Sequence, residues 1–286
     1  MKQTLKEIRE EQYAYNVPSC LALGVDINDF KGSPYTFLKM RFYIETSVVL
    51  LYFLLQTNIK PNTITIVYCL CGIIGGLMLS IPHNYTIIFA LLVFFSKSVF
   101  DNMDGHIARV KGLTSITGHI LDIYGTQLNS LGFHIGLGMY VASKTDMFIF
   151  YYLIIIYLFF RAGSLSIFSK YVMFEDISSE KNVASFLNKK GKDNVEPELI
   201  GVSYKKLKNI FFGILDDRAR SVDFICLIIL LEIFTQINIS WFLFLIIVAK
   251  FLIIFIAAFY IIGKGGWAEN EMNKKLRRLH RFLVDK

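Results

Sequence analysis

Three aspartates stand close together in a part of the chain that is otherwise mostly apolar. Asp101, Asp104 and Asp122 lie within DNMDGHIARVKGLTSITGHILDIYGT, which runs from Asp101 to Thr126. A carboxylate at the middle of a bilayer costs roughly 2.5–3.5 kcal/mol on insertion scales, and like charges held together also repel one another. A divalent cation is the natural counter-charge for such a cluster. Oxygen ligands alone favour Mg²⁺, Mn²⁺ or Ca²⁺ over zinc.

Small residues accompany the first two aspartates. On a helix that advances about 100° per residue, Asp104 lies about 60° from Asp101. Gly105 and Ala108 fall on the same face, about 40° and 20° from Asp101. This face therefore combines two acids with two residues that leave the backbone accessible to a flat ligand. It fits a nucleotide bound through a metal-bridged diphosphate.

The third aspartate belongs to the next expected helix. Gly118, Asp122 and Thr126 are spaced four residues apart, so they stack along one stripe of that helix. A tight turn near Lys111–Gly112 would join the two helices and aim the three acids at each other. The two helices are therefore predicted to form one site.

Two basic residues leave an alternative open. Lys97 precedes Asp101 by one turn and lies on its face, so it can reach a phosphate oxygen or form a salt bridge to Asp101 or Asp104. Arg109 follows on the same helix. The alternative to a metal–nucleotide site is thus a cluster that Arg109 and Lys97 neutralise without any ligand.

The spacing of these residues resembles the signature of the CDP-alcohol phosphotransferases (CDP-alcohol phosphatidyltransferases), DxxDGxxAR…GxxxDxxxD. The segment KPNTIT at Lys60–Thr65 also resembles the Pro-Asn-x-x-Thr that opens the first span in many members. The likeness covers roughly residues 40–263. Seven of the eight signature residues match, namely Asp101, Asp104, Gly105, Ala108, Arg109, Gly118 and Asp122.

The resemblance implies an activity and a set of roles. Members of the family displace CMP from a CDP-alcohol with an acceptor hydroxyl, using two divalent metals at the cytosolic side of a six-helix, usually dimeric, bundle. The three aspartates would hold one or two Mg²⁺ or Mn²⁺ ions and, through them, the diphosphate. Gly105, Ala108 and Gly118 would line the cytidine pocket, and Arg109 would support the nucleotide or the acids.

The eighth residue of the signature departs from the family. Its last aspartate, implied by the family as a metal ligand and general base, is replaced by Thr126, whose hydroxyl has no useful basicity near neutral pH. His119 is a candidate replacement base, because it precedes Asp122 by three residues and imidazole suits the task. Alternatively the metal activates the acceptor or the acceptor is already anionic, or the protein binds a CDP-alcohol without turning it over.

The elements that position these residues are expected to be membrane helices. Hydrophobic residues make up 54% of the 286 residues, and a span needs about 20 apolar residues. The apolar stretch Phe42–Gln56 is short for a span and, together with Lys39, is predicted to form an N-terminal amphipathic helix at the membrane interface. The fold class is therefore all-α, with six predicted transmembrane helices: Pro61–Ser80, Tyr85–Asn102, Leu113–Tyr140, Met147–Phe168, Val222–Gln236 and Ser240–Gly263.

The distribution of the net charge of +7 predicts orientation. The first, third and fifth connections contain only Lys144 among basic residues. The opposite side collects the N-terminal segment, Arg109 and Lys111, the insertion at 171–221 and the KKLRRLHRF tail. This asymmetry places both termini and the site in the cytoplasm of a bacterial-type inner or plasma membrane, and it argues against a nucleic-acid partner. We predict a cytosolic or interfacial segment at 1–60, a core at 61–263 with a cytosolic insertion at 171–221, and a basic tail at 264–286.

Together these features favour a membrane transferase of phospholipid or envelope-polymer synthesis. Its partners would be a CDP-alcohol donor, a lipid or other hydroxyl-bearing acceptor, and a second copy of the chain. The N-terminal approach to the first span slightly favours CDP-choline or CDP-ethanolamine donors. A catalytically silent CDP-alcohol-binding protein is the main alternative. A transporter with an acidic ion site explains the carboxylates but not Gly105, Ala108 and Gly118.

Overall fold

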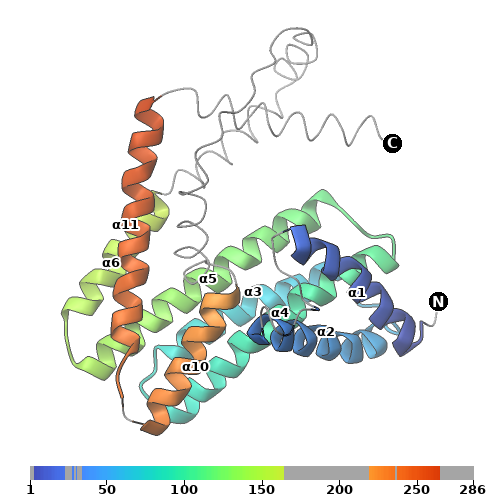
Figure 1. Ribbon diagram of the computed structural model, residues 1–286, viewed down its shortest axis with the longest axis horizontal. Coiled ribbons are helices and arrows are strands. Elements are labelled where there is room, and N and C mark those ends of the chain that lie inside the picture. The colour runs from blue at the N-terminus through green and yellow to red at the C-terminus, as the bar shows by residue number, and fades with distance from the viewer. Residues whose placement is uncertain are drawn as a thin grey trace. The chain divides into compact units, whose positions relative to one another are not determined.

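The computed structural model describes residues 3–22, 28, 30, 34–163, 219–235 and 237–264. Most of the predicted insertion at 171–221, and the tail after Lys264, lie outside these residues. The described chain is all-helical, with eight α-helices labelled in Figure 1. They are α1 (Leu5–Ala22), α2 (Pro34–Leu54), α3 (Pro61–Leu79), α4 (Asn84–Val110), α5 (Ile116–Thr145), α6 (Ile149–Ala162), α10 (Ala219–Thr235) and α11 (Ser240–Lys264).

Three of the described helices are long and apolar enough to cross a membrane: α3, α4 and the Ser240–Tyr260 part of α11. A fourth, α6, is apolar but shorter. The other two predicted spans are helical as α5 and α10 but do not belong to this group. The all-helical fold with apolar membrane helices is confirmed, and the count of six spans stays a prediction.

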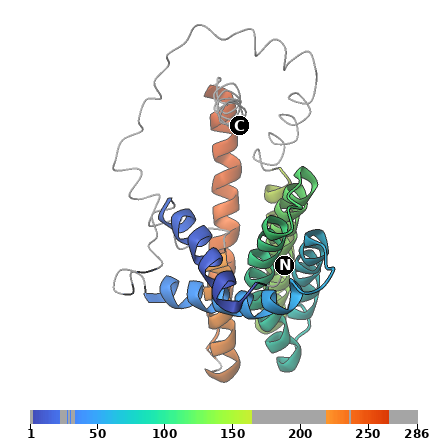
Figure 2. The same ribbon diagram turned by 90° about the vertical axis from the view of Figure 1, so that its right-hand side faces the viewer.

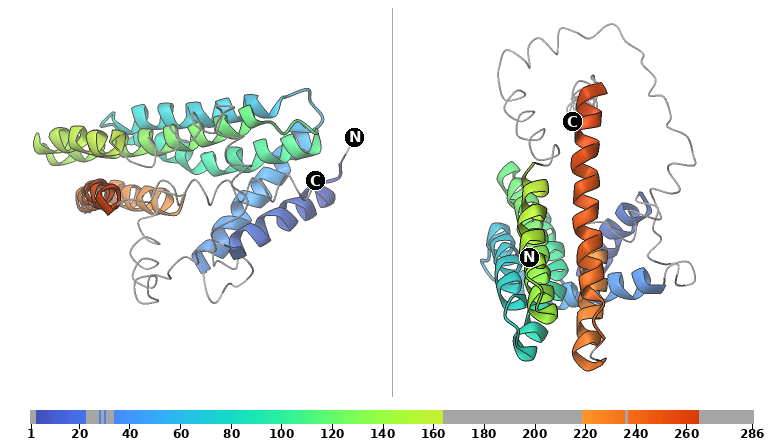
Figure 3. Two further views of the ribbon diagram at one scale, coloured as in Figure 1. Left: turned by 90° about the horizontal axis from the view of Figure 1, so that it is seen from above. Right: turned by 90° about the vertical axis from the view of Figure 1, so that its left-hand side faces the viewer.

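The chain divides into two compact units, Met1–Met147 with Asp216–Trp241, and Phe148–Leu215 with Phe242–Lys286. In the first unit, α3 packs against both α4 and α5, and the three helices run side by side (Figure 3). In the second unit, α6 and α11 contact each other through aromatic pairs such as Tyr157 with Phe251, whose ring centroids are 5.0 Å apart.

Glycines bring the backbones of α3 and α5 into direct contact. A Cβ added at Gly72 would lie 2.5 Å from Asn129 Cα, and one added at Gly132 would overlap the Gly72 carbonyl group. One turn further along, a Cβ at Gly136 would lie 2.7 Å from the Gly76 carbonyl oxygen. Close contact through small residues is how helices associate where lipid removes the hydrophobic driving force. This contact fixes the distance between the two helices.

The turn between α4 and α5 confirms the tight connection expected at Lys111–Gly112. Gly112 has a φ of 64°, a left-handed conformation that glycine adopts without steric cost. The Gly112 N–H donates to the Arg109 carbonyl at 3.2 Å, and the Leu113 N–H donates to the Ala108 carbonyl at 2.8 Å. These two bonds form a Schellman motif, which ends α4 and reverses the chain toward α5.

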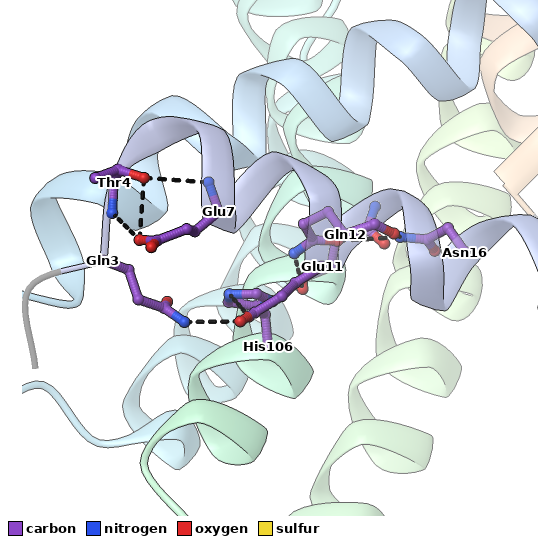
Figure 4. Close-up of polar contacts among 8 residues, drawn as sticks. Gln3, Thr4, Glu7, Glu11, Gln12, Asn16 and His106 are labelled. Carbon is purple, nitrogen blue, oxygen red and sulfur yellow. Dashed lines mark hydrogen bonds and ion pairs between the residues drawn. The ribbon is translucent and has the colours of Figure 1, made fainter.

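The helix α1 was not predicted, although its sequence carries a start signal. The Thr4 N–H donates to Glu7 Oε2 at 2.7 Å, and the Glu7 N–H donates to Thr4 Oγ1 at 3.3 Å (Figure 4). This reciprocal pair is a capping box, and the T-x-x-E spacing that encodes it is visible in the sequence. The Thr4 backbone N–H, and secondarily its hydroxyl, lower the pKa of Glu7.

The predicted interfacial helix forms as α2 and begins earlier than expected, at Pro34 rather than Phe42. It packs against α1 and α4, and Figure 2 shows it crossing the direction of α3 and α5. One face is buried, through Tyr43, Ile44, Ser47, Val48 and Leu51. The opposite side exposes a stripe of large apolar residues, Leu38, Phe42, Val49 and Phe53.

A buried glutamate ties α10 to its neighbours. The Glu232 carboxylate, 2% exposed, accepts hydrogen bonds from the Tyr140 hydroxyl of α5 at 3.0 Å and from the Ser240 N–H at 2.5 Å. It also accepts a bond from the Ile239 N–H. Glu232, on α10, therefore provides the acceptor for backbone N–H groups at the start of α11 and for the Tyr140 hydroxyl of α5.

Replacing Glu232 with alanine should destabilise the fold by about 3 kcal/mol, because three donors, two of them on the buried residues Tyr140 and Ser240, would lose their acceptor. Glu232→Gln should cost far less, since its amide oxygen can still accept and its NH₂ can donate to the Tyr140 oxygen. Thermal unfolding of the detergent-solubilised chain measures both changes. Equal unfolding temperatures for the two variants would contradict this role.

Candidate active site

A pocket of about 210 Å³ opens where α3, α4 and α5 meet at the α4–α5 turn. The start of α3 forms one wall, the last turns of α4 a second, and the turn and start of α5 a third. The residues that line it are Pro61, Asn62, Thr65, Asp104, Gly105, Ala108, Arg109, Leu113, Thr114, Ser115, Gly118, His119 and Asp122.

The Asp104 carboxylate is held rigidly in the wall of this pocket. It is 7% exposed and accepts hydrogen bonds from the Thr65 hydroxyl at 2.7 Å and from the Gly105 N–H at 2.6 Å. Two donors to one carboxyl group fix its direction. Asp104 is therefore presented to the pocket in a defined orientation.

Asp101 does not line the pocket, but its carboxyl group is near enough to those of Asp104 and Asp122 for the three to repel one another. Carboxylates held this close together need a shared proton or a cation to offset their repulsion.

This oxygen-only donor set fits a divalent cation, with Asp101, Asp104 and Asp122 as the side chains that would hold it. Within the described ranges, however, no three His, Cys, Asp or Glu side chains are already grouped around a common point as ligands. The three aspartates therefore suit a divalent cation by their chemistry and by their proximity. Their side chains are not arranged as a complete coordination shell.

Two glycines keep the pocket open. A Cβ at Gly118 would lie 3.3 Å from Ser115 Oγ and 3.4 Å from Asn62 Oδ1, and a Cβ at Gly105 would lie 3.2 Å from Arg109 Nη1. Ser115 is the N-cap of α5, where its hydroxyl accepts the Gly118 N–H at 3.0 Å. Any larger residue at the two glycines would fill space beside these polar groups.

These observations agree with the comparison to protein families. Residues 58–161 match the family model described as CDP-alcohol phosphatidyltransferase. This segment is a CDP-alcohol phosphatidyltransferase domain. It contains every residue that lines the pocket, and it confirms the resemblance inferred from the motif. None of the curated proteins matches the chain.

The phosphatidyltransferase domain places the threonine of the altered signature beside a tyrosine. Thr126 is exposed and does not line the pocket; its hydroxyl donates to the Asp122 carbonyl oxygen at 3.2 Å, and the Tyr68 hydroxyl lies 3.3 Å from Thr126 Oγ1. The neighbouring Gly125 makes room for this tyrosine, since a Cβ there would lie 2.7 Å from Tyr68 Cδ1. His119, by contrast, lies in the pocket lining.

Lys97, which was predicted to bind the donor, lies elsewhere. It is 6% exposed and does not line the pocket, and it is near enough to Asp223 of α10, as well as to Asp101, to interact with both acids. Asp223 also pairs with Lys39 and accepts a hydrogen bond from the Tyr43 hydroxyl at 3.0 Å. Helical spacing put Lys97 and Asp101 on one face but did not reveal the partner on α10.

The start of α3 contributes three residues to the pocket for which no role was predicted. Pro61, Asn62 and Thr65 all line the pocket, and Thr65 is the hydrogen-bond donor to Asp104. The signal was present, because these three residues are the Pro-Asn-x-x-Thr of the KPNTIT segment. Tyr68 was missed for a different reason, since nothing in the sequence connects it with Thr126.

Proposed function

We propose that the protein is an integral membrane transferase that moves a substituted phosphoryl group from a CDP-alcohol to an acceptor hydroxyl and releases CMP. The observation that carries this proposal is that six of the eight signature positions meet in one pocket of a CDP-alcohol phosphatidyltransferase domain. They are Asp104, Gly105, Ala108, Arg109, Gly118 and Asp122. The product would be a phospholipid or an envelope-polymer intermediate.

The pocket residues divide into three proposed roles. Asp101, Asp104 and Asp122 would hold one or two Mg²⁺ or Mn²⁺ ions, and Thr65 orients Asp104 for this. Such a cation, when bound, draws charge from the leaving CMP and polarises the attacked phosphorus. The remaining residues act on the donor itself. The small side chains at positions 105, 108 and 118 leave space for the cytidine, and Arg109 supplies positive charge.

We propose that His119 is the general base that removes the proton from the acceptor hydroxyl. Its side chain lines the same pocket as Asp122, and imidazole is suited to general-base catalysis near neutral pH. Thr126 lies outside the pocket lining, where its hydroxyl bonds to a backbone carbonyl and approaches Tyr68. The position that carries the family's last aspartate is thus filled by neutral hydroxyl groups. This absence of a carboxylate is the observation that favours the alternative of a silent CDP-alcohol-binding protein.

We further propose that six spans cross the membrane and that α2 lies at the interface, with its exposed apolar stripe toward the lipid. The basic asymmetry of the sequence places the pocket on the cytoplasmic side. A second copy of the chain would complete the assembly, as the family resemblance implies.

CMP release from a panel of donors tests the function. The full chain, purified in detergent or nanodiscs, is offered CDP-ethanolamine, CDP-choline or CDP-diacylglycerol with candidate hydroxyl acceptors and Mg²⁺ or Mn²⁺. The transferase should release CMP with one donor, lose this activity on chelation and regain it with added Mn²⁺. Donor binding without CMP release under any acceptor would instead establish the silent binder.

His119→Asn should lower CMP release by about 10²-fold, the usual contribution of a general base. Thr126→Asp in the same variant should restore part of the rate, because it returns a carboxylate to the signature position next to Asp122. Initial rates of the single and double variants measure both effects. An unchanged rate in His119→Asn would remove the histidine from the chemistry and point to an acceptor that needs no base.

A further inference from the structure

The helix α1 packs against the end of α4 that carries the signature (Figure 4). Gln12 Nε2 donates to the Asn102 carbonyl oxygen at 3.4 Å, and Glu11 Oε2 lies 3.6 Å from His106 Nε2. Asn102 directly follows Asp101, and His106 lies two residues after Asp104. Because α1 lies outside residues 58–161, the family match does not cover it.

This docking is specific, because the buried stripe of α1 is largely polar. Gln12 is 0% exposed, and Asn16 one turn later donates to the Gln12 side-chain oxygen at 3.0 Å and to its carbonyl oxygen at 2.9 Å. Ile8, one turn earlier, is also fully buried. Buried polar groups are tolerated only where partners match them. The position of α1 along α4 is therefore fixed.

The docked helix places an aromatic ring on the signature arginine. The guanidinium carbon of Arg109 lies 3.7 Å from the centroid of the Tyr15 ring. The same guanidinium lies close to the backbone of Gly105, since a methyl group there would be 3.2 Å from Arg109 Nη1. Arg109 thus folds back along α4 beside the pocket, with Tyr15 stacked on its flat face.

Stacking of this kind leaves the binding edge of the guanidinium available. An aromatic ring interacts with the face of the arginine plane, whereas its five N–H donors point outward in that plane. On α4, Asn102, His106 and Arg109 follow one another at spacings of four and three, so they share the face turned to α1. Arg109 differs from the other two because it also lines the pocket.

We propose that α1 is part of the donor site and that Tyr15 is a positioning residue. Tyr15 holds the Arg109 guanidinium beside the pocket so that its N–H edge binds the diphosphate of a CDP-linked donor. The identity of this ligand rests on the proposed function. The contact between Tyr15 and Arg109 is given by the structure alone.

The affinity of the full-length chain for CDP tests this role, because CDP shares the nucleotide and diphosphate of every candidate donor. Tyr15→Leu removes the ring and should raise the Kd for CDP in Mg²⁺, measured by isothermal titration calorimetry, by about 3- to 10-fold. Tyr15→Phe keeps the ring and should bind as the wild type does. With a turned-over donor, Tyr15→Leu should raise KM by the same factor and leave kcat unchanged.

Tyr13→Leu is the matched control, because Tyr13 lies on the same helix but contacts α2, where its hydroxyl donates to Glu45 at 3.2 Å. It should leave CDP affinity unchanged. In an Arg109→Gln background, Tyr15→Leu should have no further effect, since the guanidinium it positions is gone.

If the wild type binds CDP, any one of three results would overturn the role of Tyr15 but not the proposed function. These are an unchanged Kd in Tyr15→Leu, an equal increase of the Kd in Tyr13→Leu, or a loss of CDP binding in Tyr15→Phe. A wild-type chain that binds no CDP would overturn the proposed function together with it.

Discussion

Asp104→Asn should lower the rate of CMP release by about 10²-fold or more. The change keeps the size of the side chain but removes the charge that the Thr65 hydroxyl and the Gly105 N–H orient toward the pocket. The asparagine oxygen can still accept from one of these donors, so the fold should persist. What disappears is a charged ligand for a divalent cation, whose Lewis-acid effect is worth several kcal/mol. Initial rates of CMP release with Mg²⁺ and Mn²⁺ measure the loss.

Asp146→Asn provides the matched control for this substitution. Asp146 is exposed at the opposite end of α5 and has a φ of 54°, a left-handed conformation that asparagine also adopts readily. The control variant should keep full activity and stability. Activity of Asp104→Asn within a factor of two of the wild type would mean that the carboxylate does not act in catalysis. The site would then have to be reassigned.

Gly132→Ala should lower the unfolding temperature of the chain by roughly 5–10 °C, which corresponds to a cost of about 3 kcal/mol. The added methyl group would overlap the Gly72 carbonyl group, and a backbone atom cannot rotate away. The helices α3 and α5 must therefore separate, although alanine by itself favours the helix. Donor binding should weaken as well, because both helices line the pocket. Thermal unfolding in detergent and the Kd for CDP measure these two effects.

Gly75→Ala separates this contact from any general effect of replacing glycine. Gly75 lies on α3 between the other close contacts, but the three heavy atoms nearest to a methyl group there all belong to the ring of Phe94, the closest at 3.0 Å. A side chain can shift by a few tenths of an ångström, so this variant should lose much less stability. If the two alanine variants unfold at the same temperature, direct backbone contact between α3 and α5 is not what holds the pair together.

The aspartate signature, the turn between α4 and α5 and the start of α1 are all specified by residues that are close together in the sequence. The left-handed glycine at position 112 and the capping box at Thr4–Glu7 depend only on neighbouring residues, so each leaves a pattern that can be read in one dimension. The turn at Gly112 was predicted from its pattern, whereas the helix that begins at the capping box was not. The apolar stretches likewise determined where most helices form, because 20 or so apolar residues have few alternatives.

The direction of each helix face could not be read in the same way. A helix that is apolar almost all round carries no amphipathic stripe to indicate which side turns inward. The sequence therefore placed Lys97 with Asp101 but could not show that Asp223 on α10 interacts with it as well. It also gave no sign that Tyr68 would meet Thr126, 58 residues away.

The sequence by itself determined which residues carry the chemistry: the spaced aspartates, the small residues beside them and the loss of the last carboxylate at Thr126. Only the tertiary structure decided their partners, because these depend on how closely and at what rotation the helices pack. The glycine contacts of α3 with α5 set that packing. That packing brings the hydroxyl groups of Tyr68 and Thr126 together. The packing of α3 against α4 brings the Thr65 hydroxyl to Asp104. The docking of α1 adds Tyr15 on Arg109, which no spacing along the chain could have indicated.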